Sequence, residues 1–529
     1  MPLVSSAVPA TKVSFTSAYE NGELDRFFDC PRPPLTARPT DSLDRPRSRL
    51  AAALKSEASR LGAHPEVLKR ADSLAHPDSL AVVTGQQAGL LLGPNFTLSK
   101  TATASTVARR LDSEAAPAVP VFWLASQDHD IDEINHTYLL DLDETLHRLD
   151  IGLPANVPTG HIPMRAAWLN RITEALAQVR SQPEHYQDVK EKLSQAAAVA
   201  DTWSDFFAAF YYAVLGADAP LVLDPVRPGL APLFTDVIAR EIGDPEASTE
   251  AINLAGEQLN RLGFKPQLGR GRDATNLFIT MREDGLPRRQ LLRYSDGLFH
   301  SGSSSWSRQD LLALLDTEPE RITPAAGLRP VTQDAVLPTA AFVVGPGELR
   351  YIAQLRDVYR LHGVSQPTIW PRAEVTIIEP PVRRILNGFG LTATEYLADP
   401  AGHERRDLLQ QSGAASRFGS ALEALGSSQA ELTEALLGID PSLAGAVNRH
   451  AERVKLSLDH LEARTAAALK KRESTLSRQH ARLRSQLLPD GSKQERLLSP
   501  VSFFLKFGIG PVLRLFRQVP ESGSVWPEI

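Results

Sequence analysis

The stretch VVTGQQAGLLLGPNFTLSK, Val82 to Lys100, starts as a buried strand, turns through glycine and two glutamines, and is predicted to enter a helix. A second apolar run, at residues 116–126, follows that helix. Strand, helix and strand in this order indicate a βαβ unit of a parallel sheet. Similar runs at 219–225, 338–348 and 366–380 extend the pattern to five strands. The sequence therefore predicts an α/β fold with a parallel sheet at its core.

Two stretches interrupt the predicted sheet and are interpreted as connecting insertions. The first, at about residues 155–215, is helical. The second, at about 245–325, joins helix to a hairpin with turn signals at Asp284-Gly285 and Asp296-Gly297. The predicted domains are a mostly helical lead-in at 1–75, the sheet domain at 76–385, a helical region at 386–490 and a segment at 491–529 that packs back on the core.

The region from Val447 to Leu487 is nearly free of glycine and proline, and its apolar residues are regularly spaced. Apolar or small residues recur at intervals of four and three from Val447 to Ala468, and the register slips by one at Leu469. Seven-residue spacing on each side of a slip predicts a coiled coil over about 440–490. The alternative is a long amphipathic helix that lies on its own domain, but the apolar seam is narrow. We expect a homodimer through this segment.

Composition narrows the class of protein. The chain has 529 residues and a net charge of -6, which argues against a general nucleic-acid binder. Its single cysteine, Cys30, excludes an intramolecular disulfide and favours a reducing compartment. The N-terminus lacks the pattern of a signal peptide, and no apolar run approaches the roughly 20 residues of a membrane-spanning helix. We expect a cytoplasmic protein that binds neither nucleic acid nor membrane.

The turn after the first strand is a candidate ligand site. Loops at the carboxyl ends of parallel strands bind ligands, and the following helix start suits a phosphate or carboxylate. The glycines would let a ligand approach the backbone, while the glutamines offer donors and acceptors. The alternative is a glycine turn that serves only a tight chain reversal. The candidate binding residues in this stretch are Gly85, Gln86, Gln87, Gly89, Gly93 and Asn95.

The second strand ends in WLASQDHDIDEINH, where carboxylates and histidines crowd together. A calcium loop that starts at Asp128 is excluded, because Glu133 and Leu139 hold its sixth and twelfth positions. A helix cap at Asp130 with Glu133 as its partner remains possible. We favour a catalytic site made by Asp128, His129 and Asp130, since a cap leaves two of these residues unexplained. The carboxylates would raise the pKa of His129, which could steady a phosphate charge or shuttle a proton.

A second strand-turn-helix junction, Gly345-Pro346-Gly347-Glu348, follows the fourth predicted strand. It is either a plain helix start with proline near its first position or part of the same site as the first junction. The candidate binding residues from this half of the chain are Arg329, Gln333, Gly345, Gly347, Glu348 and Arg372. No metal site is recognised, and the H-E-x-x-H, C-x-x-C and G-x-S-x-G motifs are absent.

These stretches resemble one family. VVTGQQAGLLLGPNFTLSK, PVFWLASQDHDIDEINH, LRPVTQDAVLPTAAFVVGPGELRYIAQL and WPRAEVTIIE occur in this order, followed by the coiled-coil region and KQERLLSPVSFFLKFG. Together they closely resemble the bacillithiol biosynthesis BshC family over most of the chain, less so in the insertions and before residue 75. The resemblance implies a Rossmann-like core related to class I aminoacyl-tRNA synthetases and nucleotidyltransferases. It also implies two connecting insertions and a dimerising coiled coil.

The resemblance implies a reaction as well: the carboxyl group of L-cysteine is joined to the amine of glucosaminyl malate, the last step to bacillithiol. By analogy with the synthetases, ATP or another nucleotide, with Mg²⁺ possible beside it, would activate cysteine as an adenylate. GPNFTLSK stands where the synthetases have H-x-G-H, and K-M-S-K-S is absent. Lys100 and His129 are the candidates to take over the charge stabilisation. Two alternatives stay open: a synthetase-like enzyme for another acid, and a non-catalytic nucleotide-binding scaffold.

Overall fold

Five parallel strands form the central sheet of the computed structural model, in the order β12-β11-β1-β2-β5. They are β1 (Leu80–Gln86), β2 (Ala118–Leu124), β5 (Leu221–Leu223), β11 (Thr339–Val344) and β12 (Thr368–Pro371). Their Val, Ile and Phe residues are buried on both faces, as a parallel sheet covered by helices requires. Each strand coincides with a predicted apolar run, so the expected α/β core is confirmed.

The structure describes residues 14–30, 43–271, 273–472 and 474–529. Of the predicted lead-in, residues 1–13 and 31–42 lie outside this range; its described part contains α1 (Phe15–Glu20), α2 (Arg47–Arg60) and α3 (Pro65–Ser73). The chain divides into a first unit of 1–376 with 495–527 and 529, and a second unit of 377–494 with 528. No helix in the described ranges is both long and apolar enough to cross a membrane.

The strand order places a topological switch beside β1. From β1 the chain proceeds to β2 and β5 on one side, and then returns to β11 and β12 on the other. The crevice outside the carboxyl ends of β1 and β11 is therefore the expected ligand site of such a sheet. Helix α4 (Phe96–Leu111) connects β1 to β2, and its Ala104 and Val107 pack with Val82, Val343 and Trp370 in the core.

The first insertion is helical, as expected, with α5 (Ala166–Gln178), α6 (Pro183–Val199) and α7 (Trp203–Leu215). Helix α7 begins at a capping box of Thr202 and Asp205, and almost all of its residues are buried. A small hairpin that the sequence analysis did not predict precedes these helices. It pairs β3 (His136–Leu140) with β4 (Leu146–Asp150).

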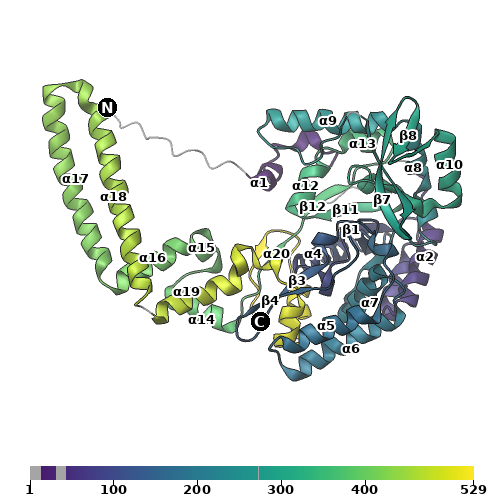
Figure 1. Cartoon of the computed structure of the whole chain (residues 1–529), viewed down its shortest axis with the longest axis horizontal. Coiled ribbons are helices and arrows are strands. Elements are labelled where there is room, and N and C mark those ends of the chain that lie inside the picture. Colours follow the sequence, from purple (N-terminus) through teal and green to yellow (C-terminus); the bar gives the residue numbers. More distant parts are fainter. Residues whose placement is uncertain (1–13, 31–42, 272, 473) are drawn as a thin grey trace. The chain divides into compact units, whose positions relative to one another are not determined.

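The second insertion carries an antiparallel sheet in the order β10-β6-β7-β8-β9, of which β7 and β8 are labelled in Figure 1. Its strands are β6 (Ala274–Glu283), β7 (Leu286–Ser295), β8 (Leu298–Ser301), β9 (Ser304–Trp306) and β10 (Ile322–Pro324). The predicted turns are present, because Asp284 and Gly285 have φ values of 50° and 78°, and Asp296 and Gly297 of 52° and 80°. The helices around this sheet and at its exit are α8 (Thr235–Gly243), α9 (Pro245–Arg261), α10 (Arg308–Thr317), α11 (Arg329–Val336), α12 (Pro346–Ile352) and α13 (Arg356–Leu361).

The second unit is helical. It contains α14 (Pro380–Phe389), α15 (Ala393–Ala398), α16 (Pro400–Gln411), α17 (Ala414–Ile439), α18 (Ala444–Lys470) and α19 (Ser474–Leu487). Helices α17 and α18 form a hairpin and lie side by side (Figure 1). The predicted continuous helix is interrupted between Lys470 and Ser474, directly after the slip of its apolar register at Leu469.

The C-terminal segment returns to the first unit. It contains α20 (Gln494–Leu497), α21 (Val501–Phe507), α22 (Ile509–Arg517) and β14 (Ser524–Val525). Strand β14 pairs in parallel with β13 (Glu374–Val375), which directly follows the last strand of the central sheet. Residues far apart in the sequence therefore build one α/β unit.

Candidate functional site

A cavity of about 360 Å³ lies at the carboxyl ends of the central strands. Its wall combines residues from the turns after β1, β2, β11 and β12 with residues from β7, α11, α12 and α20. The predicted site residues that line it are Gly85, Gln86, Gln87, Lys100, Asp128, Arg329, Gly345, Gly347, Glu348 and Arg372. Both strand-turn-helix junctions thus contribute to one site, as the switch in strand order requires.

Other predicted residues do not line the cavity: Gly89, Gly93, Asn95, His129, Asp130 and Gln333. The glycines serve the turn itself. A Cβ on Gly89 would lie 2.8 Å from the Cα of Gly93, and buried Leu91 and Leu92 have φ values of 53° and 69°. Ser499 donates a hydrogen bond to the Leu91 carbonyl, which holds this turn in place. A side chain at position 89 would therefore disrupt the turn, and the tight chain reversal accounts for Gly89 and Gly93.

The ammonium group of Lys100 makes all of its contacts within the protein. Its buried Nζ donates to the Gly85 carbonyl at 2.8 Å and to Gln86 Oε1 at 3.0 Å, and pairs with Glu348 Oε2 at 2.5 Å. Burial lowers the pKa of Lys100, although Glu348 acts against this shift. Because an ammonium group has three N–H donors, these contacts leave none for a ligand. Lys100 therefore joins the ends of β1 and β11 rather than offering a free charge.

Arg372 is also paired. Its guanidinium binds Glu495 of the C-terminal segment through two hydrogen bonds of 2.6 and 2.7 Å, and both side chains are 2% exposed. Such a bidentate contact fixes the relative orientation of the two side chains as well as the distance between them. The pair attaches the start of the C-terminal segment to the wall of the cavity.

Arg289 and Arg329 differ from these cations. Arg289 reaches the cavity from β7, where it lies 3.9 Å over the Phe278 ring and donates to Thr323 Oγ1 and the Pro324 carbonyl. Arg329 donates to Tyr351 Oη at 2.5 Å. Within the described part of the chain, neither guanidinium forms an ion pair with a carboxylate. Burial lowers the pKa of Arg289 to about 10, so it remains charged at neutral pH.

Asp128 organises the loop after β2. Its Oδ1 accepts hydrogen bonds from the backbone N–H groups of His129 and Asp130, and its Oδ2 accepts one from Gln87 Nε2. Burial acts to raise the pKa of Asp128, but Arg289 and these donors outweigh it and lower the pKa. The cap alternative is not realised, because Asp130 makes no capping hydrogen bond to the short 3₁₀ turn at Ile131–Glu133.

His129 lies beside the cavity and not in its wall. Its Nδ1 is 3.5 Å from Arg289 Nη1 and accepts from it, and its ring packs against Phe278. The expected rise of its pKa is wrong: burial and Arg289 lower the pKa, and Asp128 and Asp130 do not compensate. The sequence could not show this, because Arg289 arrives from a distant hairpin. His129 is neutral at physiological pH and supports the arginine.

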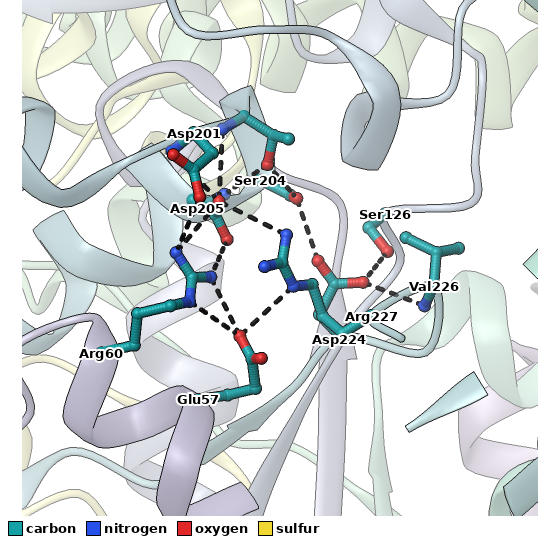
Figure 2. Close-up of polar contacts among 10 residues, drawn as sticks. Glu57, Arg60, Ser126, Asp201, Ser204, Asp205, Asp224, Val226 and Arg227 are labelled. Carbon is teal, nitrogen blue, oxygen red and sulfur yellow. Dashed lines mark hydrogen bonds and ion pairs between the residues drawn. The ribbon is translucent and has the colours of Figure 1, made fainter. Parts of the chain in front are cut away.

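A buried polar cluster fixes the start of the same loop (Figure 2). Asp224, at the end of β5, accepts hydrogen bonds from Ser126 Oγ, from Ser204 Oγ at 2.9 Å and from the Val226 N–H at 3.1 Å. The backbone carbonyl of Ser126 accepts from the Gly160 N–H at 2.9 Å. The residues that follow Ser126, including Asp128, are thereby held at a fixed place in the cavity wall.

Next to this carboxylate, two arginines pair with three further acids, Glu57, Asp201 and Asp205 (Figure 2). Arg60 binds Asp205 at 2.6 Å and Glu57 at 2.9 Å, and Arg227 lies 3.2 Å from Glu57. The network ties α2 to the start of α7 and to the turn after β5. Both arginines are paired with acids of the protein, so we interpret the network as support for the loop.

Several cavity residues were not predicted as site residues, namely Phe96, Gln127, Glu133, Gln267, Arg289, Tyr351 and Arg496. Gln127 and Phe96 are next to predicted residues, so only their roles were missed. Arg289 carries a weaker signal: it is one of only two buried residues of β7, with Leu292, and the burial of this strand does not alternate. Finding it requires knowing that the hairpin of the second insertion faces the carboxyl edge of the central sheet.

Comparisons with known proteins agree with this architecture. The N-terminal Rossmann-like domain of bacillithiol biosynthesis BshC matches residues 11–373, and the C-terminal coiled-coil domain of BshC matches residues 375–522. A relative from Thermus thermophilus is 38% identical over 90% of this chain and 93% of its own length. Relatives from Symbiobacterium thermophilum and Geobacillus kaustophilus are 33% and 31% identical, over 90% of this chain and 88% and 89% of their own lengths. All three are named as proposed cysteine ligases, BshC.

Proposed function

The chain belongs to the BshC family of bacillithiol biosynthesis, and from this we propose that it is a ligase that joins L-cysteine to the amine of glucosaminyl malate. The observation that supports this best is the pair of cavity guanidiniums, Arg289 and Arg329, with no carboxylate partner in the described chain. Asp128 and Glu348 act on these cations only from a distance, and a buried cation without a direct ion pair is costly. An anionic ligand in contact with the guanidiniums reduces that cost.

The substrates match this requirement. Glucosaminyl malate carries two carboxylates on its malate part, and a planar guanidinium binds a carboxylate through two parallel hydrogen bonds. A nucleotide phosphate offers the same type of acceptor. Lys100 and Arg372 already have carboxylate partners. Arg289 and Arg329, together with the exposed Arg496, are therefore the cavity cations available for substrate, since none of them forms an ion pair in the described residues.

A free carboxylate does not form an amide until its hydroxyl is made a leaving group. In the proposed reaction the cysteine carboxylate attacks the α-phosphorus of ATP and pyrophosphate leaves. The amine of glucosaminyl malate then attacks the carbonyl carbon, the C–O bond to phosphate breaks, and AMP departs with the electron pair. Arg289 and Arg329 would hold the anionic groups in place and stabilise the negative charge that builds up. We further propose that the enzyme acts in the cytoplasm as a homodimer.

The test is reconstitution with purified protein, cysteine, glucosaminyl malate and each common nucleoside triphosphate, with bacillithiol detected by mass spectrometry. Arg289→Gln should lower kcat/KM on the order of 100-fold, as expected for the loss of one charge-stabilising donor. Arg293→Gln is the matched control: it lies on the same strand, is paired with Asp273 at 3.3 Å and is outside the cavity. Absence of product with every nucleotide, or equal effects of both variants, contradicts the proposal.

A further inference from the structure

The cavity has an acidic side that the anion-binding residues do not explain. Asp128 and Glu133 line its wall from the loop after β2. A third carboxylate of the wall, Glu348, is neutralised by Lys100 and also accepts from the Gly345 N–H at 2.9 Å. Glu133 has neither a hydrogen bond nor an ion pair with any residue that the structure describes. It is an unpaired carboxylate at the edge of the proposed active site.

Asp128 and Glu133 have opposite environments. Asp128 accepts three N–H donors and faces Arg289, and it stays ionised. Glu133 faces no such donor. Glu133 is exposed to solvent, like its neighbour Asp132, but partial desolvation of its carboxyl by the cavity wall, together with the charges of Asp130 and Asp128, raises its pKa. Two neighbouring carboxylates with opposite shifts are the usual arrangement in which one stays charged and the other exchanges a proton.

The other proton acceptors of this region are already engaged. His129 Nδ1 accepts from Arg289, and the ring is outside the cavity wall. Lys100 uses its three N–H donors within the protein. Burial raises the pKa of Tyr351 to about 12, so its hydroxyl stays protonated. Glu133 is thus the cavity group left to accept a proton at neutral pH.

We propose that Glu133 is the general base of the second half-reaction, and that it accepts the proton of the sugar amine while ionised Asp128 holds the ammonium form before attack. This rests on the proposed function. The bound ammonium first releases one proton to water. The neutral nitrogen then forms the new bond to the carbonyl carbon of activated cysteine, AMP leaves with the electron pair, and the second nitrogen proton passes to the Glu133 carboxylate. The substrate is then held at both ends, its carboxylates at the arginines and its amine at the acids.

The experiment measures the two half-reactions separately. Glu133→Gln keeps the size of the side chain but removes the base, so amide formation should fall on the order of 100-fold. Cysteine-dependent pyrophosphate exchange should stay at the wild-type rate, because activation precedes the amine's attack. The part of the acidic limb of the pH–rate profile that comes from protonation of Glu133 should disappear in this variant, while the part that comes from protonation of the substrate amine stays. Glu133→Asp should restore part of the rate. The other charged groups of the cavity wall are unchanged in both variants: Lys100, Asp128, Arg289, Arg329, Glu348, Arg372 and Arg496.

Asp132→Asn is the control, because Asp132 is an exposed carboxylate one residue away and outside the cavity. It should behave as the wild type. Wild-type rates of amide formation in Glu133→Gln would overturn the proposal, and so would equal losses in Asp132→Asn, which would indicate a role in folding the loop. A wild-type protein that neither exchanges pyrophosphate nor forms product refutes the proposed function itself, a result distinct from a selective effect at Glu133.

Discussion

At the scale of the residue, Asp224 links the stability of the fold to pH. Burial raises the pKa of this carboxyl to about 6, although Ser126, Ser204 and the Val226 N–H donate to it. An unfolded aspartate has a pKa of about 3.9, so the native state binds the proton more tightly. This contribution to stability is complete below about pH 4 and is lost as pH rises through about 6, a change on the order of 3 kcal/mol.

We therefore expect Asp224→Asn, which stays neutral, to lose less stability than the wild type between pH 4 and 7. Urea unfolding at several pH values across this range gives the two curves of unfolding free energy. The difference between them isolates Asp224 from other buried acids such as Asp334, whose pKa burial also raises to about 6. If the curves of wild type and Asp224→Asn ran parallel, the Asp224 carboxyl would have the same pKa in the folded and the unfolded protein, which would contradict the prediction.

The candidate residues that the sequence could indicate are those that follow a strand directly. Asp128 and Glu348 were found this way, because the carboxyl end of a parallel strand is a known position in space. Arg289 was not, since its place depends on how an inserted hairpin packs. The predicted direction of the His129 pKa shift was wrong for the same reason. The sequence shows the neighbouring carboxylates, but it does not show that His129 is partly buried or that Arg289 lies beside it.

At the scale of the element, the buried pair of Arg372 and Glu495 attaches the C-terminal segment to the central sheet. Glu495→Gln leaves a buried arginine without its counter-charge, so we expect a loss of about 3–5 kcal/mol in the free energy of unfolding. Glu521→Gln is the control. Glu521 belongs to the same segment, but its partner Arg110 is half exposed, and such pairs contribute about 1 kcal/mol or less. Chemical denaturation of both variants provides the comparison, and equal losses would argue against a special role of the buried pair.

The elements that were predicted have strong periodic signals. All five central strands and the Asp-Gly hairpins follow from buried apolar runs and from turn residues with left-handed backbone. The hairpin of β3 and β4 was missed, because its short strands are only partly apolar and lie next to a dense acidic stretch. The break after α18 has no glycine or proline to mark it, and only the slip of the apolar register indicated it.

At the scale of the whole molecule, the hairpin of α17 and α18 exposes apolar side chains that another copy of the chain could cover. Leu456 and Leu461 of α18 are 66% and 53% exposed. We expect wild-type protein to have twice the 57.7 kDa mass of one chain, and the double variant Leu456→Glu, Leu461→Glu to be a monomer. Light scattering coupled to size exclusion measures this. Leu254→Glu, on α9 and 52% exposed, should leave the dimer intact. A double variant that keeps the dimer mass places the interface elsewhere.

The discontinuity of the first unit has a consequence for the order of synthesis. Arg496 belongs to the cavity wall, and Glu495 pairs with the wall residue Arg372. Both are translated only after the entire helical unit of 377–494. A nascent chain that has emerged as far as residue 376 can pair its five strands, but its Arg372 lacks the carboxylate it binds in the finished protein. The helical unit must therefore be synthesised before the cavity can be completed. A chain that stalls within that unit can form the central sheet but not the complete cavity.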